Sequence, residues 1–217
     1  MKPDLQIEQI VGYPCRCIAG VDEVGRGCLA GPVTAAAVLL PDTICFEENP
    51  WLSEVSDSKK LTALKRERLA PLISCWARAV AIGTASVQEI DQINIARASL
   101  LAMERAVFGL LHESDGSSPE SILPDHVLVD GQFLPAKLES RATAVIRGDG
   151  RCLSIACASI VAKVWRDQHM NELEISYPGY GFSIHKGYPT VLHLNALKDL
   201  GVSPIHRRSF RPVAELL

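Results

Sequence analysis

The feature that most constrains this chain is an apolar run that ends in two adjacent carboxylates. Residues 16–22 are expected to form a buried strand, and Asp22 and Glu23 stand at its end, followed by Gly-Arg-Gly at 25–27. A buried charge without a partner is costly, so carboxylates at the end of a core strand predict a cation between them. Glycine lets the backbone turn sharply and lets a ligand approach closely. The stretch therefore predicts a divalent-metal site beside a backbone surface that contacts a substrate.

The rest of the chain alternates apolar segments with breaks rich in Gly and Pro, which predicts an α/β protein with a mixed sheet. A length of 217 residues fits a single domain, taken as 1–217 with a short C-terminal tail at about 201–217. Because a short link separates the first two strands, they are expected to form an antiparallel hairpin. The expected strands are 16–22, 33–40, 78–85, 126–131 and 143–146; the expected helices are 61–76, 93–111, 154–177 and 189–200; the expected irregular segments are 41–58, 112–121, 180–188 and 201–212.

Charge and cysteine content exclude some classes of protein. The net charge is −3, so the whole molecule is not a basic nucleic-acid binder, although nine Lys/Arg against five Asp/Glu lie between Arg147 and Arg211. That segment could hold a polyanion, or it could form ordinary solvated helical faces. Seven cysteines without CxxC spacing argue against zinc, and no apolar run approaches the ~20 residues of a membrane span. A cytoplasmic protein without a membrane partner is expected.

Two more strands end in acids, Asp130 and Asp149. Ligands of open α/β sheets bind beyond the strand ends, so these two acids are expected to share one small space with Asp22 and Glu23. Oxygen ligands select hard cations such as Mg²⁺ or Mn²⁺, and two ions about 4 Å apart would clamp the attacking and leaving oxygens of a phosphodiester. Taken alone, a strand-terminal Asp-Gly such as that at Asp130 is more often a turn.

Asp22 and Glu23 raise a geometric question, because neighbours on a regular strand point to opposite faces of the sheet. Asp22 is expected to be the central ligand. Glu23 can join it only if the strand has already bent, and Gly25 makes an early bend plausible.

This constellation resembles the bacterial ribonuclease HII family over nearly the whole chain. The matching blocks are 19–27, 29–38, 57–61, 129–131, 148–149, 158–167 and 185–188. The resemblance implies a ribonuclease H-like fold, a five-stranded mixed β-sheet flanked by α-helices. It also implies an endonuclease that hydrolyses the RNA strand of RNA–DNA hybrids and cleaves 5′ of ribonucleotides embedded in duplex DNA. The implied mechanism uses two metal ions, leaves 3′-OH and 5′-phosphate ends, and serves ribonucleotide removal in DNA repair and replication.

The resemblance also assigns roles to individual residues. The catalytic acids, which would bind two Mg²⁺ or Mn²⁺ ions, are Asp22, Glu23, Asp130 and Asp149. The residues that would contact the 2′-hydroxyl region of the nucleotide are Gly25, Arg26 and Gly27. Tyr188 would lie against the sugar at the RNA–DNA junction, since a 2′-OH is the group that distinguishes RNA from DNA. Without the resemblance, Tyr188 would be assigned as a packing aromatic.

Contacts with the substrate backbone are expected from Ser58, Lys59, Lys163, Arg166 and Lys186, with Lys60 helping. Lys163 and Arg166 are three residues apart and so share one side of the predicted helix. The alternative for Arg166 is a local ion pair with Asp167, since such exposed pairs are common. Arg207 and Arg208 near the end of the chain could also reach the duplex.

Several points depart from the family or stay open. Arg147 stands where lysine is common before Gly-Asp, and Cys157 where alanine is usual; the chain also lacks the extra C-terminal helices of some members. A monomer is expected, and a sliding clamp is a candidate partner. The alternatives are a non-catalytic hybrid-binding module and a different metal nuclease on the same fold. A zinc site at His185 and His193 lacks a third ligand with suitable spacing.

Overall fold

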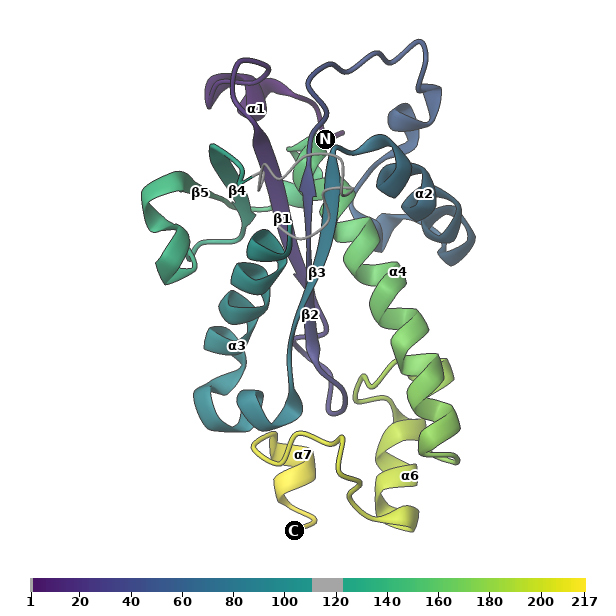
Figure 1. The fold of residues 1–217 in the computed structure, drawn as a ribbon. Helices are drawn as coiled ribbons and strands as arrows, with labels where there is room; N and C mark the ends of the chain where they lie inside the picture. The colour runs from purple at the N-terminus through teal and green to yellow at the C-terminus, as the bar shows by residue number, and fades with distance from the viewer. Residues whose placement is uncertain (1, 111–122) are drawn as a thin grey trace.

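The structure, a computed structural model, describes residues 2–110 and 123–217. Five strands form one mixed sheet in the order β3-β2-β1-β4-β5. β1 pairs with β2 and β2 with β3 in antiparallel fashion, whereas β1 with β4 and β4 with β5 are parallel (Figure 1). The predicted five-stranded mixed sheet is confirmed. The strands are β1 (Ile18–Val24), β2 (Val33–Leu39), β3 (Ala79–Ala85), β4 (His126–Asp130) and β5 (Ala142–Val145).

Helices connect and cover these strands. The α-helices are α1 (Gln6–Ile10), α2 (Ala63–Trp76), α3 (Val87–Gly109), α4 (Leu153–Ser176), α5 (Phe182–His185), α6 (Val191–Leu200) and α7 (Arg211–Ala214). Short 3₁₀ segments are η1 (Pro50–Glu54), η2 (Ser58–Lys60), η3 (Ala136–Arg141) and η4 (Gly148–Gly150).

Two glycines let the long helices sit directly on the sheet. α3 covers one face, and α4 with α2 covers the other (Figure 1). A Cβ atom on Gly83 would lie 2.2 Å from the carbonyl oxygen of Ala102 in α3, and one on Gly20 would lie 2.3 Å from the carbonyl carbon of Ser154 in α4. A side chain at either position would therefore force helix and sheet apart.

The parallel pairing of β1 with β4 determines where the acids lie. Val21 is paired with Val129, so the next residues, Asp22 and Asp130, stand side by side at the same edge of the sheet. β4 ends at Asp130, whereas the pairing of β1 with β2 continues to Val24. The last residues of β1 therefore have a neighbouring strand on one side only.

The helix predicted at 93–111 begins earlier than expected. α3 starts at Val87, where Ser86 and Glu89 form a capping box. Asn94 interrupts it with a φ of 67°, and its side chain accepts hydrogen bonds from the N–H groups of Ala96 and Arg97, which restarts the helix. The Ser-x-x-Glu pattern at 86–89 is a sequence signal for this start. The prediction overlooked it and began the helix only at the part that contains Asn94.

Other segments differ from prediction in smaller ways. α1 was not predicted, the segment 41–58 contains η1, and the segment 180–188 contains the single turn α5. The predicted loop 112–121 lies outside the described residues. Among the helices of the described ranges, none has the length and apolar character to cross a bilayer.

The C-terminal segment 201–217 is packed against the body of the protein. Ala30 and His206 form an isolated antiparallel bridge, and the side chain of Val213 in α7 is buried with Leu29 and Leu197. α6 and α7 lie at the end of the molecule opposite α1 (Figure 1). The loop that follows β1 is therefore held between the sheet and the end of the chain.

Candidate active site

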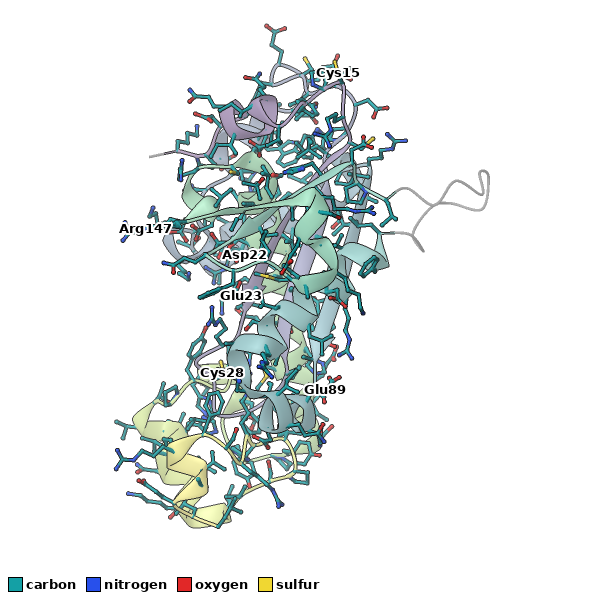
Figure 2. All side chains as sticks on the ribbon, turned by 90° about the vertical axis from the view of Figure 1, so that its left-hand side faces the viewer. Cys15, Asp22, Glu23, Cys28, Glu89 and Arg147 are labelled. Atoms are coloured by element: carbon teal, nitrogen blue, oxygen red, sulfur yellow. The ribbon has the colours of Figure 1, made fainter. Side chains whose placement is uncertain are left out.

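Three of the four predicted acids converge beyond the ends of β1 and β4. Oxygen atoms of Asp22, Glu23 and Asp130 lie within 4.8 Å of one another, the arrangement that a hard cation needs. Asp22 and Glu23 lie close together at mid-height of the molecule in Figure 2. The structure thus brings together side chains that are more than a hundred residues apart in sequence.

Glu23 joins this group although it leaves β1 on the opposite face from Asp22. Asp22 is on the face of β1 that packs on α4, as Gly20 does, and Glu23 faces α3, where it lines a pocket with Leu100 and Met103. Because β4 has ended at this level, both carboxylates reach the same open space at the edge of β1. The strand is not bent before Glu23, and the open edge gives the physical reason that the two acids can still meet.

Asp149 lies in η4, immediately after β5, and is tied to the group through its neighbour. The Gly148 N–H donates a 2.6 Å hydrogen bond to Oδ1 of Asp130. Arg147, at the start of this turn, adopts a left-handed conformation with a φ of 55°. Asp149 is 8% exposed and is not among the three acids that meet within 4.8 Å. It therefore lines the side of the site.

The electrostatics of these acids are those of a site built for positive charge. Burial, followed by the negative charges of Glu23 and Asp130, raises the pKa of Asp22 well above its usual range. Burial likewise raises the pKa of Glu23, against the opposing effect of Arg26. The pKa of Asp149 is raised by burial and by Asp130. Bound cations would offset this mutual repulsion.

Two serines from η2 and α4 pair with each other beside Asp22. The hydroxyls of Ser58 and Ser159 lie 2.8 Å apart. Ser58 is 5% exposed. The Ser58 hydroxyl is therefore paired inside the protein, and the phosphate contact predicted for Ser58 remains a prediction for its main chain.

Lys59 faces the acids, beside an open cavity. Burial alone would lower its pKa, but the charges of Asp22 and Asp149 outweigh burial and the pKa of Lys59 is raised. The cavity has a volume of about 540 Å³ and lies between η2 and η4. It is lined by Asp57, Lys59, Lys60, Asp130, Ile146, Arg147, Asp149, Gly150 and Arg151. A cavity lined by both acidic and basic side chains suits a phosphodiester backbone and its bound cations.

The Gly25–Gly27 turn leaves β1 directly beside the acids. Gly25 has a φ of 90° and packs on Arg166, whose Nε would lie 2.2 Å from an added Cβ. Arg26 pairs with Glu23 at 3.1 Å, and its side chain is otherwise exposed. An added Cβ at Gly27 would meet nothing within 4 Å. One side of the turn is therefore closed by protein, and the other is open.

Arg166 does not face the substrate, so its predicted phosphate contact is wrong. The residue is 0% exposed, and its guanidinium donates to the carbonyl oxygens of Pro32 (3.2 Å), Lys186 (2.8 Å) and Ala30 (3.2 Å). The local ion pair considered for it is also absent, because Asp167 pairs with Lys163 at 2.7 Å. The sequence places Arg166 on a predicted helix, but it does not show that this face of the helix is buried.

Two of the expected lysine contacts, Lys163 and Lys186, are half-buried near Tyr188. The ammonium group of Lys163 lies 5.8 Å from the centroid of the Tyr188 ring. Lys186 donates to the side chain of Asn171 and to the carbonyl oxygen of Ser183. Both ammonium groups can exchange such surface partners for a phosphate. Tyr188 is 36% exposed, and burial raises the pKa of its phenol.

The main chain around Tyr188 is held by a chain of histidines. Nδ1 of His193 lies 3.0 Å from the carbonyl oxygen of Tyr188, which can only accept, so Nδ1 carries the proton. Nε2 of His193 then accepts from Nε2 of His206 at 3.0 Å, and Nδ1 of His206 accepts from the Ser203 N–H and hydroxyl. Nε2 of His185 lies 2.8 Å from the Tyr180 carbonyl. These ring nitrogens are committed to hydrogen bonds.

Several supporting residues were missed by sequence reasoning. They are Asp57 and Arg151 in the cavity wall, Ser159 on α4, and His206 after α6. The suggestion that Arg207 reaches the duplex is wrong, because it is 0% exposed, whereas the neighbouring Arg208 is exposed. A Ser on the buried stripe of a predicted helix is a usable signal, but nothing in the sequence of the tail indicates a buried arginine.

A mixed sheet with convergent carboxylates at the ends of its central strands, beside a cavity rimmed with basic side chains, defines a hydrolase of the ribonuclease H-like class. The family model described as Ribonuclease HII matches residues 19–213. The chain belongs to the ribonuclease HII family and is a ribonuclease, a metal-dependent hydrolase.

Individual relatives agree with this placement. Ribonuclease HII of Nitrosococcus oceani is 56% identical over 200 residues, which is 92% of this chain and 91% of that protein. Ribonuclease H2 from Pyrococcus horikoshii, known from a crystal structure, has a sequence 25% identical to this chain. The two structures match with a TM-score of 0.69 over 92% of this chain and 96% of that chain. Ribonuclease HII of Archaeoglobus fulgidus, solved in complex with PCNA, is 25% identical, with a TM-score of 0.68 over 89% and 95% of the two chains.

Proposed function

We propose that this protein is an endonuclease that hydrolyses the RNA strand of RNA–DNA hybrids and cleaves 5′ of ribonucleotides embedded in duplex DNA. The observation that carries the proposal is the convergence of Asp22, Glu23 and Asp130 within 4.8 Å, next to the Gly25–Gly27 turn. Carboxylates can hold the cations that phosphodiester hydrolysis requires, and an exposed glycine turn can approach a ribose closely.

The acids are proposed to bind two Mg²⁺ or Mn²⁺ ions. The all-oxygen donor set supports this, as does the raised pKa of Asp22, caused by burial and by its acidic neighbours. Asp22, Glu23, Asp130 and Asp149 would hold the ions. When bound, such ions activate water and stabilise the leaving oxygen of the phosphodiester. The expected products are a 3′-OH and a 5′-phosphate.

The protein's own groups then orient the substrate. Lys59 and the basic rim of the cavity would bind backbone phosphates near the acids. Backbone groups of the Gly25–Gly27 turn and the phenol of Tyr188 would contact the ribose and its 2′-OH, which DNA lacks. Lys163 and Lys186 would contact phosphates beside Tyr188. Arg26 would keep Glu23 in place through their 3.1 Å ion pair.

The cellular setting follows from the proposed substrate. An enzyme of this kind would act in the cytoplasm as a monomer, in ribonucleotide removal during DNA replication and repair. A sliding clamp is the proposed partner, because the Archaeoglobus fulgidus relative was solved in complex with PCNA. Residues 1–217 are proposed to form a single catalytic domain.

A gel assay on three labelled duplexes tests the proposal. The duplexes are all DNA, DNA with one ribonucleotide, and an RNA–DNA hybrid, each with Mg²⁺, Mn²⁺ or EDTA. We expect a single cut 5′ of the ribonucleotide and multiple cuts in the hybrid, both abolished by EDTA. Binding without cleavage would indicate a hybrid-binding module, and cleavage of the all-DNA duplex would indicate a different metal nuclease; either result would overturn the proposal.

A further inference from the structure

Arg207, in the segment after α6, is a buried cation without a carboxylate partner. It is 0% exposed, and none of the ion pairs among the described residues includes it. Burial lowers the pKa of its guanidinium to about 10. Burying a charge in this way is costly, so its hydrogen bonds must all be well placed.

All three donor nitrogens of Arg207 point at the loop that follows β1. Nε and Nη2 donate to the carbonyl oxygen of Gly31 at 3.0 and 2.9 Å, and Nη1 donates to the carbonyl oxygen of Arg26 at 2.9 Å. The main chain joins the same loop, because the Arg207 N–H donates to Leu29 at 2.8 Å. One planar guanidinium therefore bridges two carbonyl groups at the two ends of this loop.

The Arg26 carbonyl belongs to the same planar peptide unit as the Gly27 N–H. A charged donor on the carbonyl polarises the unit and strengthens its N–H as a donor. The Gly27 N–H makes no hydrogen bond within the described ranges, Gly27 is exposed, and an added Cβ there would meet nothing within 4 Å. This N–H is therefore free to meet a ligand on the open side of the turn.

We propose that Arg207 is a positioning residue for ribose recognition, which sets the direction and the donor strength of the Arg26–Gly27 peptide from the buried side of the turn. It does so without touching the substrate. The inference rests on the proposed function, in which the Gly25–Gly27 turn contacts the 2′-OH region. The C-terminal segment would then contribute to the preference for ribonucleotides as well as to packing.

The test uses the full chain and the variant Arg207→Lys. Lysine keeps the charge, but a single ammonium group lacks the planar fork that reaches both carbonyl groups. Arg211→Lys is the matched control, because Arg211 lies four residues further along the same segment, is exposed, and has no place in the site. The readouts are kcat/KM on duplex DNA with one ribonucleotide, Kd for the all-DNA duplex of the same sequence, and the melting temperature.

We expect Arg207→Lys to lower kcat/KM at least roughly tenfold, the effect of losing one well-oriented hydrogen bond to a charged group. The Kd for all-DNA duplex should stay within about twofold, since that duplex offers no 2′-OH for the turn to contact. Arg211→Lys should leave kcat/KM unchanged. An unchanged kcat/KM in Arg207→Lys, or a parallel loss of DNA binding, would overturn the proposal.

A second variant covers the case in which Arg207→Lys folds poorly. In Arg207→Ala, millimolar guanidinium should restore ribonucleotide cleavage, and methylammonium should not, because only guanidinium has the planar fork. Restored melting temperature without restored cleavage would overturn the proposal. Failure of the wild-type protein to cleave the ribonucleotide duplex at all would refute the proposed function itself, which is a separate outcome.

Discussion

The Gly148 N–H donates a 2.6 Å hydrogen bond to Oδ1 of Asp130, which joins the end of β4 to the turn that carries Asp149. This bond fixes one carboxylate oxygen of Asp130 and leaves the other available to a cation. It also links two acids that follow different strands of the sheet. Substitutions at Asp130 can therefore separate the charge of this residue from its structural bond.

Asp130→Asn should abolish cleavage while the turn at Gly148 stays in place. An amide oxygen can still accept the Gly148 hydrogen bond, but the negative charge that a hard cation needs is gone. We expect the cleavage rate to fall by at least about 100-fold, more than the loss typical of an outer-sphere partner. Gel assays and hybrid binding by fluorescence anisotropy measure the two effects. Full Mg²⁺-dependent activity in this variant would reject the site.

Tyr188→Phe should weaken the preference for ribonucleotides more than it affects folding. The carbonyl oxygen of Tyr188 is held by His193, so the variant keeps the backbone position and loses only the phenol hydroxyl. We expect the ratio of cleavage rates on single-ribonucleotide and long-hybrid substrates to fall severalfold, consistent with one lost hydrogen bond. If that ratio is unchanged, Tyr188 does not read the ribose.

Glu8→Ala should destabilise the protein by about 1–3 kcal/mol, the cost of leaving buried polar groups unpaired. Oε1 of Glu8 accepts from the N–H and the hydroxyl of Ser154, at 2.9 and 2.8 Å, where α4 begins. Chemical denaturation with urea measures the change. Glu8→Gln is the control, because its amide oxygen keeps both hydrogen bonds. Equal destabilisation by both variants would show that the hydrogen bonds from Ser154 to Glu8 contribute nothing to stability.

Glu8→Gln also makes a prediction about pH. Burial raises the pKa of Glu8 above its usual value of 4.5. The folded state therefore holds this proton more tightly than the unfolded state, and stability falls as the pH rises from 4.5 through the folded pKa. The wild-type protein should lose stability relative to Glu8→Gln over that rise. Urea denaturation at a series of pH values tests this, and parallel curves would contradict it.

Acid should weaken the histidine network that holds Tyr188. Burial lowers the pKa of His193 and of His206 to about 4, from the usual 6.5, so the folded state favours the neutral rings. The stability they contribute is present above pH 6.5 and is lost as the pH falls toward 4. A double variant with His193→Gln and His206→Gln should lose less stability than the wild-type protein over this pH range. Thermal melting at a series of pH values measures the difference. An equal loss in both proteins would count against the network.

Much of the fold was predictable because strands and acids have strong local signals. The run that ends in Asp22 and Glu23 is apolar because β1 is buried. Its parallel neighbour β4 is apolar up to Asp130 for the same reason. A local sequence pattern does not show where each side chain points in the folded protein. Glu23 was expected to need a bent strand, and instead it reaches the site around the edge that β4 leaves open.

The supporting residues were harder to predict because their roles depend on contacts distant in sequence. Arg166 and Arg207 look like surface cations in the sequence, and only the folded chain shows each guanidinium among backbone carbonyl groups. Glu8 lies in a short N-terminal helix whose sequence has no clear helical signal, and its partner Ser154 is 146 residues away. Such contacts follow from the assembled sheet and helices.

Mn²⁺ binding, measured by isothermal titration calorimetry on the wild-type protein and on Asp22→Asn, tests the central claim most directly. Asp22 is one of the three acids that meet within 4.8 Å, and its Oδ1 accepts a 2.7 Å hydrogen bond from the Glu23 N–H. If these carboxylates hold the cations, the affinity for Mn²⁺ should fall at least roughly tenfold in the variant, as expected when one charged oxygen ligand is lost. An unchanged affinity and stoichiometry in Asp22→Asn would contradict the account.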